Sequence, residues 1–209
     1  MGTTQTIGTA RPAFRRAPEQ KREQLLAAAR ALFSSQGYDQ TSTVQIAARA
    51  GVSEGILFHH FGSKGGLFAQ LAEQFAVDAA AATMPAQSDQ TTEESVVRSA
   101  FDFSDRDPDL YRVLSEDGPK LRDFDVAKYS DIVISQIERN LDKGMREGRV
   151  RLGNARVMAE LHLAVVDGAY RAWRKSGKAA LREVYILEAI HAMQAMLQPA
   201  KASRRRNEK

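Results

Sequence analysis

The chain has 209 residues, of which 43% are hydrophobic, and it carries no cysteine and a formal net charge of +4. This composition excludes a disulfide scaffold, a cysteine-ligated metal site and a cysteine nucleophile, and it is too apolar for a globally disordered chain. Neither a membrane span nor a secretory signal is predicted, because no run of about 18 apolar residues occurs and the N-terminal stretch lacks an apolar segment, so we expect a cytoplasmic protein.

The charge is unevenly distributed along the chain. Residues 1–76 carry 8 basic and 5 acidic side chains, residues 77–200 carry 17 and 20, and residues 201–209 carry 5 and 1. A basic segment favours a polyanionic partner. We expect residues 1–16 to form a flexible basic arm and residues 199–209 a disordered basic tail, each of which either contacts a polyanion or is solvated.

Helical spacing of apolar residues predicts four helices in the N-terminal third of the chain. The first is expected from about 18 to 35, with Pro18 in its first turn and Gly37 after its end. The expected ranges of the others are about 43–50, a short stretch between Ser53 and Gly62, and about 64–82. Hydroxyl side chains precede each of the last three and are suited to cap them.

Gly51 interrupts the apolar pattern between the second and third of these helices. Glycine supplies the positive φ of a tight turn without steric cost, and Ser53 restarts the helix directly after it. The small Ala47 lets the two helices cross closely, and Val52 and Leu57 are expected to bury between them. Two short helices joined in this way predict a helix-turn-helix, whose second helix enters the major groove of DNA.

Beyond a polar stretch at residues 84–94, the sequence predicts further helices and no clear strand. Their expected ranges are about 91–104, 108–116, 119–147, 154–176 and 181–197, separated by prolines and glycines. The predicted fold class is therefore all-α. We expect a three-helix DNA-binding domain of the helix-turn-helix type over residues 17–76 and a larger helical ligand-binding and dimerisation domain over residues 77–198.

The segment "LLAAARALFSSQGYDQTSTVQIAARAGVSEGILFHHFGSKGGLF" resembles the N-terminal domain of the TetR family of bacterial transcriptional regulators. The similarity extends from Lys21 to Leu71, and beyond it the chain matches the family only in helix number and length. The resemblance implies a homodimer whose C-terminal domain forms the interface and holds a small-molecule pocket. Ligand binding would change the spacing of the two DNA-binding domains and release a (pseudo)palindromic double-stranded operator.

By motif position, the resemblance places eleven residues at or near DNA. They are Thr41, Thr43, Gln45, Ser53, Glu54, Gly55, Ile56, Phe58, His59, His60 and Lys64. The resemblance places Thr41, Thr43, Gln45 and Lys64 against backbone phosphates. The hydroxyls in the set either contact phosphates, cap helices, or do both. Phe58 stands where the family usually has tyrosine, and Glu54 stands where a basic residue is common. We expect Glu54 to add specificity at some cost in affinity, because a carboxylate repels phosphate but accepts a hydrogen bond from a cytosine amine.

Candidate metal sites fail on geometry. His59 and His60 are adjacent, so on a helix they point about 100° apart and do not suit chelation of one ion. Residues 105–116 place acids as a calcium loop does, but Leu110 stands where the loop needs glycine. We expect no metal and no other cofactor, and no phosphate-binding glycine loop, HExxH or G-x-S-x-G motif indicates an enzyme.

The effector pocket is expected among apolar and aromatic residues of the C-terminal helices. The candidates are Phe101, Phe103, Tyr111, Phe124, Tyr129, Val133, Met158, His162 and Val166. Four-residue spacing puts the last three on one helical face, where His162 either orients a polar ligand group or is a satisfied core histidine. The dimer interface is expected on the last two helices, at Val165, Trp173, Tyr185, Ile186, Ala189, Ile190, Met193 and Leu197.

Three hypotheses about function remain open. The favoured one is a homodimeric repressor that a small apolar or aromatic ligand releases from its operator. The second keeps DNA binding but replaces the ligand with an architectural role or a protein partner. The third, a helical enzyme, has no motif in its favour.

Arg11, Arg15 and Arg16 of the arm either enter a minor groove or stay solvated.

Overall fold

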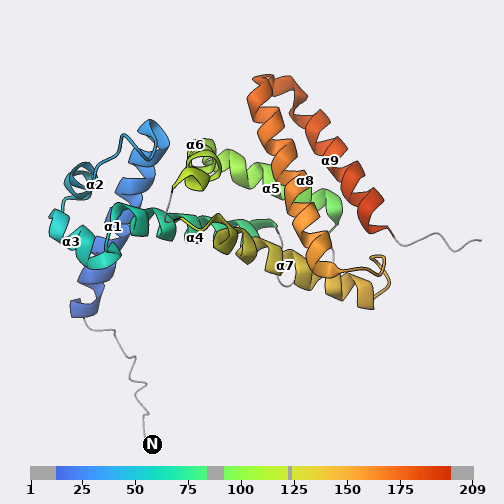
Figure 1. Ribbon diagram of the computed structural model, residues 1–209, viewed down its shortest axis with the longest axis horizontal. Coiled ribbons are helices and arrows are strands. Elements are labelled where there is room, and N and C mark those ends of the chain that lie inside the picture. Colours follow the sequence, from blue (N-terminus) through green and yellow to red (C-terminus); the bar gives the residue numbers. More distant parts are fainter. Residues whose placement is uncertain (1–12, 84–91, 122–123, 199–209) are drawn as a thin grey trace, which may run out of the picture. The chain divides into compact units, whose positions relative to one another are not determined.

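We describe the protein from a computed structural model, over residues 13–83, 92–121 and 124–198 (Figure 1). Every regular element within these ranges is a helix, as the sequence predicts. The chain divides into two units: the first comprises residues up to Leu71 together with Arg112–Phe124, and the second comprises Ala72–Tyr111 and the residues from Asp125 onward. The segment Arg112–Phe124, which we expected in the C-terminal domain, therefore belongs to the first unit.

The first unit contains α1 (Ala13–Gln36), α2 (Thr43–Ala50), α3 (Glu54–Phe61) and the beginning of α4 (Lys64–Thr83). One apolar cluster joins them, with Leu25, Phe33, Ile46, Leu57 and Phe68 fully buried. Each such side chain contributes about 1.5–3 kcal/mol to folding. Because α2 and α3 each supply only one of these anchors, their orientation depends on the longer helices behind them.

Two expected helix boundaries need correction. α1 begins at Ala13 and not at about 18, so Pro18 lies inside it. Pro18 is the sixth residue of α1, and because proline has no backbone N–H, the helix lacks one hydrogen bond to the carbonyl four residues earlier. The single helix expected over 119–147 is shorter: α7 spans Val126–Arg146, and the Asp125 carboxylate accepts the backbone N–H groups of Ala127 and Lys128 at its start. The cap therefore sets this boundary.

The second unit is built from α5 (Glu93–Arg106), most of α6 (Pro108–Arg112), α7, α8 (Ala155–Ser176) and α9 (Arg182–Leu197), with a 3₁₀ turn at Ala179–Leu181. A π-helical turn (Val113–Asp117) and a 3₁₀ turn (Gly118–Lys120) follow α6 and belong to the first unit. α8 packs against both α7 and α9, and α8 and α9 lie side by side (Figure 1). None of the described helices is long and apolar enough to cross a membrane.

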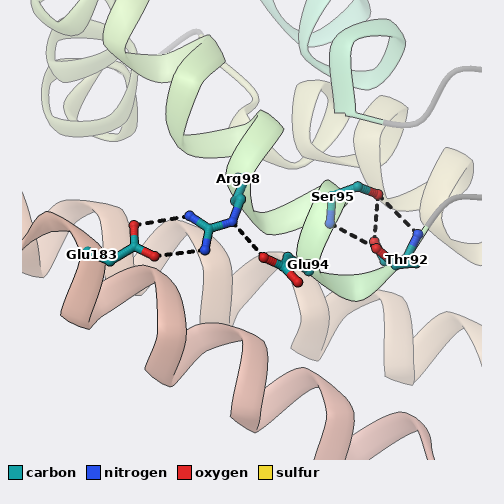
Figure 2. A network of polar contacts seen from close by, with 5 residues as sticks. All are labelled: Thr92, Glu94, Ser95, Arg98 and Glu183. Atoms are coloured by element: carbon teal, nitrogen blue, oxygen red, sulfur yellow. Dashed lines mark hydrogen bonds and ion pairs between the residues drawn. The ribbon is translucent and has the colours of Figure 1, made fainter.

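A network of polar contacts joins α5 to α9 (Figure 2). The Arg98 guanidinium donates to both carboxylate oxygens of Glu183, at 2.7 and 3.0 Å, and to Glu94 at 2.9 Å. One turn earlier, Thr92 and Ser95 cap the start of α5 through reciprocal hydrogen bonds. The bidentate pair is exposed, so it orients the two helices more than it stabilises them.

The charged tails fall outside the described part of the chain. Residues 1–12, which include Arg11, and residues 199–209 lie outside it, and the side chains of Arg15 and Arg16 are not described. Whether the arm contacts DNA stays a prediction from the sequence.

Candidate DNA-binding interface

The start of α2 is closed by a reciprocal cap. The Ser42 hydroxyl accepts the backbone N–H of Gln45, and the Gln45 side chain accepts the backbone N–H of Ser42 at 2.8 Å. Gln36 also donates to the Gln45 side chain at 3.2 Å. This arrangement satisfies orphan amides of the helix start. Gln45, expected at a phosphate, is therefore engaged in holding α2 in place, although its side chain is exposed.

The turn between α2 and α3 has the predicted geometry. Gly51 adopts φ +66°, a region open to glycine at little cost, and its N–H together with that of Val52 closes the end of α2 on the carbonyls of Ala48 and Ala47. Ala47 and Leu57 are buried where the helices cross. The helix-turn-helix predicted from Gly51 is confirmed.

The recognition helix α3 presents a partly apolar, partly polar outer face. Ser53, Gly55, Phe58 and His59 are exposed, and Phe58 keeps 46% of its surface accessible. The Ser53 hydroxyl makes no capping bond, so it stays available to an external partner. Ile56 instead packs against the apolar cluster of the first unit, which leaves it little surface for DNA.

Two residues expected at phosphates are committed to the protein itself. Thr41 is 1% exposed, and its hydroxyl donates to the Gly37 carbonyl at 2.7 Å. The Lys64 ammonium donates to the carbonyls of Tyr38 and Thr41 at 3.0 and 2.9 Å and lies 4.1 Å from the centre of the Tyr38 ring. Partial burial lowers the pKa of Lys64 below its ordinary value. Thr41 is therefore structural, and Lys64 has at most one of its three N–H groups left for a phosphate.

The adjacent histidines of α3 form no chelating pair. Their rings meet edge to face with centroids 5.4 Å apart. The pKa of His60 is lowered, first by partial burial and then by the nearby charges of His59, Arg22 and Lys21. In the described part of the chain, no group of three or more acidic, histidine or cysteine side chains is placed to hold a metal. The exposed ring of His59 can donate an N–H to an anionic surface.

Sequence reasoning missed two features of this surface. Val44 on α2 is 61% exposed although it is apolar. Thr43 donates its hydroxyl to the Glu54 carboxylate, so the first residues of α2 and α3 are bonded to each other. Spacing alone gave no signal for this bond, since eleven residues and a turn separate the partners.

Residues 25–71 match the model of the family described as bacterial regulatory proteins, tetR family. This part of the chain is a DNA-binding domain of the TetR family, and α2 and α3 are its helix-turn-helix.

Relatives match over longer stretches of the chain. The nucleoid occlusion factor SlmA of Shewanella denitrificans is 28% identical over 158 residues, which is 71% of this chain and 80% of SlmA. A TetR-family transcriptional regulator from Pectobacterium atrosepticum has the same fold, with a TM-score of 0.65, 24% identity, and coverage of 90% of this chain and 98% of that one. A complex of SmeT with triclosan superposes with a TM-score of 0.67 at 20% identity, over 88% and 93% of the two chains.

The residues expected at an effector pocket are only partly brought together. Phe101 and Val166 share one apolar cluster of the second unit, with Tyr111 packed against it. Met158 belongs to another cluster, with Val133 packed against it. Phe103 and Tyr129 are half-buried in the same unit. Phe124 lies elsewhere: it packs edge-on against Phe68 at 4.9 Å, in the core of the first unit, because the chain turns back before α7 begins.

His162 is the unusual member of this set. It lies one helical turn after Met158 and one before Val166 on α8, and only 6% of its surface is exposed. Among the described residues, neither ring nitrogen has a hydrogen-bond partner, and desolvation lowers the pKa of His162 to about 4. A buried imidazole without partners is costly. The sequence left open that His162 is a core histidine with its hydrogen bonds satisfied. The described residues supply no such bonds.

The residues expected at a dimer interface face inward. Trp173, Ile186, Ala189, Ile190, Met193 and Leu197 are each at most 8% exposed and fill the protomer's own core, and Val165 and Tyr185 pack against it. They leave almost no surface for a second copy. The apolar side chains that these two helices do expose are Val157 and Leu161 on α8 and Val184 and Leu187 on α9, at 41–51%. Val165 and Tyr185 remain partly exposed, and the dimer interface on these two helices stays a prediction.

Proposed function

We propose that the protein is a homodimeric repressor that leaves its operator when a small, mostly apolar molecule binds the second unit. The observation that carries the ligand part is His162, whose two ring nitrogens are buried and find no partner in the described part of the chain. A ligand with a neutral hydroxyl, carbonyl or amide group would satisfy one of them, and the other nitrogen, which points in a different direction, would need a second polar group or a water molecule. A neutral group suits the site, because the lowered pKa keeps the imidazole uncharged at neutral pH.

An aromatic cluster around Tyr170, about two helical turns from His162 on α8, favours an aromatic or aliphatic ligand body. Tyr170 lies in contact with Phe101, Tyr111 and Trp173, with ring centroids 5.3, 4.7 and 5.7 Å apart. Rings at these distances form an adaptable apolar wall. SmeT, which shares the fold, forms a complex with the aromatic compound triclosan. Both points support the proposed ligand class.

For the homodimer, we propose the outward faces of α8 and α9. Val157 and Leu161 are four residues apart, and the small Ala164 and Gly168 continue the same stripe of α8. On α9, Val184 and Leu187 are exposed in the same way. Small residues beside exposed leucine and valine let two helix pairs approach closely. A second copy of the same face covers all of them at once, as two-fold symmetry requires.

A second candidate function comes from SlmA. That relative is a nucleoid occlusion factor, and the similarity spans most of its length. By this comparison the chain would bind DNA in order to act on another macromolecule, with no small-molecule effector. The unpartnered His162 favours the first candidate.

The test is binding of the purified protein to the DNA upstream of its own gene and to random DNA, across a salt series. A specific regulator keeps a large preference for the upstream DNA at physiological salt, where non-specific binding has weakened. Equal binding that fades alike with salt would contradict a local operator and favour the second candidate.

The same preparation offers an effector assay. Trp173 is the only tryptophan of the sequence and packs within the cluster around Tyr170. Its fluorescence should change as phenolic and aliphatic compounds saturate the second unit, and the responding compounds should release the upstream DNA. His162→Leu should lose the response to compounds that carry a hydrogen-bonding group. If no compound changes either signal, the ligand part of the proposal is wrong.

A further inference from the structure

Thr43 and Glu54 hold each other across the helix-turn-helix. Thr43 is the first residue of α2 and Glu54 the first residue of α3, and the Thr43 hydroxyl donates to Oε1 of Glu54. Both side chains are half-buried, and the turn at Gly51 brings them together. The resemblance had placed each of them separately against DNA. The structure shows them as a bonded pair on the elements that face DNA.

The pair has a chemical consequence for phosphate. A threonine hydroxyl has a single hydrogen, so one bond to Glu54 uses the donor that a phosphate oxygen would need. The carboxylate accepts hydrogen bonds and carries a negative charge, so it repels a phosphate that approaches Thr43. In the DNA-free protein, Glu54 therefore takes the place that a phosphate oxygen would take at this hydroxyl.

We propose that the bond between Thr43 and Glu54 suppresses binding to non-operator DNA, and that the pair thereby sets the specificity of the regulator. The Thr43 hydroxyl can donate to a phosphate only after its hydrogen bond to Glu54 breaks. A DNA sequence with a cytosine at this position offers its amine to the Glu54 carboxylate and so replaces the lost hydrogen bond. On a DNA sequence without that cytosine, the carboxylate has no hydrogen-bond partner and is repelled by the phosphates. This inference rests on the proposed DNA-binding function and adds to it the residues that discriminate between sequences.

A double-mutant cycle on a random-sequence duplex tests the inference. Glu54→Ala should tighten binding to random DNA by about tenfold, because a repelling charge is lost and Thr43 is freed. Thr43→Val should change binding by less than about twofold in the wild-type background, where the hydroxyl is already engaged. In the Glu54→Ala background, the same change should weaken binding by about fivefold. Thr43→Ser, which keeps the hydroxyl, should behave as the wild type does in both backgrounds.

Glu23→Ala is the matched control, because it removes one negative charge from an exposed position of α1 in the same unit. We expect it to change binding by less than about twofold. Equal tightening by Glu23→Ala and Glu54→Ala would overturn the inference, since net charge would then explain both. The inference would also be overturned if Thr43→Val lowered the affinity for random DNA equally in the two backgrounds. If no variant binds any duplex at low salt, the proposed function itself fails, which differs from binding without coupling.

Discussion

The two units of the protein differ in how they satisfy their polar groups. In the first unit, polar side chains near the surface are bonded locally, as Lys64 is to the carbonyls of Tyr38 and Thr41. In the second unit, His162 is buried with no hydrogen-bond partner among the residues that the structure describes, while Leu161 on the same helix is exposed to water. Each of these two states costs free energy in an isolated protomer. Under the proposed function, the first unit is complete by itself, whereas a ligand and a second copy would complete the second.

The largest expected effect tests the completeness of the first unit. A Cβ added to Gly66 would overlap the backbone carbonyl oxygen of Phe61, so Gly66→Ala should lower the free energy of unfolding by about 3 kcal/mol or more. Gly65→Ala is the matched control, because its Cβ would lie 3.6 Å from the Ser63 hydroxyl, an ordinary contact. Thermal unfolding of both variants gives the comparison. Equal stability of the two would show that the start of α4 relaxes freely.

His162→Leu tests the incomplete site in the second unit. The pKa of His162 is lowered to about 4, so below about pH 6.5 the unfolded chain binds a proton that the folded chain refuses. Stability is thus fully present above pH 6.5 and falls toward pH 4, by up to about 3 kcal/mol. His162→Leu should remove this loss, and should stabilise the protein by about 1–2 kcal/mol at pH 7.

Denaturant unfolding of the wild type and the variant between pH 7.5 and 4.5 measures the difference. His162→Gln is the second arm of the experiment, because it removes the titration but keeps a buried polar group. It should flatten the pH dependence without the gain at pH 7. A gap between wild type and leucine variant that stays constant with pH would mean that His162 titrates normally.

Leu161→Glu tests whether a second copy completes the exposed face of α8. A carboxylate there should convert the dimer to a monomer, and should weaken operator binding by about tenfold or more, because two linked DNA-binding domains bind more tightly than one. Ala180→Glu, an exposed position in the turn before α9, should leave both properties unchanged. Sedimentation and DNA titration report the two effects. A monomeric wild type would end this proposal.

Lys64→Met returns to the first unit with a smaller effect. Losing the two bonds to Tyr38 and Thr41 should destabilise the protein by about 1–2 kcal/mol. If the Lys64 ammonium mainly binds a phosphate, as the resemblance implies, Lys64→Met would leave the free energy of unfolding unchanged. The number of ions released on DNA binding, measured from its salt dependence, would then fall by about one per protomer. Unfolding and salt titrations of the same variant distinguish the two roles.

The smallest expected effect is a pH dependence of DNA binding. The pKa of His60 is lowered in the DNA-free protein by partial burial and by His59, Arg22 and Lys21. A nearby phosphate would raise this pKa, so DNA binding takes up a proton and tightens as pH falls. We expect a gain of about threefold from pH 8 to pH 6 at fixed salt, reduced in His60→Gln. Affinity that falls as pH falls would contradict a phosphate near His60.

The sequence predicted the helices of both units, but it predicted the side-chain contacts of neither unit fully. The helix-turn-helix was predictable because Gly51 has a unique conformational role and because capping side chains mark the helix starts. The structural roles of Thr41 and Lys64 were not predictable, because their side chains bond to backbone carbonyls of the loop between α1 and α2. On α9, apolar residues occur on nearly all sides, so periodicity could not separate the buried Ile186 from the exposed Leu187.

The segment Arg112–Phe124 has a consequence for protein engineering. Phe124 and Val113 lie against the core formed by α1 and α4, although they come from the middle of the chain. The DNA-binding unit is therefore discontinuous in sequence, and a graft that ends after α4 would leave part of its core uncovered. Chimaeras that exchange DNA specificity between relatives should transfer both segments together or confine the changes to the outward side of α3. The same constraint links the evolution of two stretches of the gene that are more than forty codons apart.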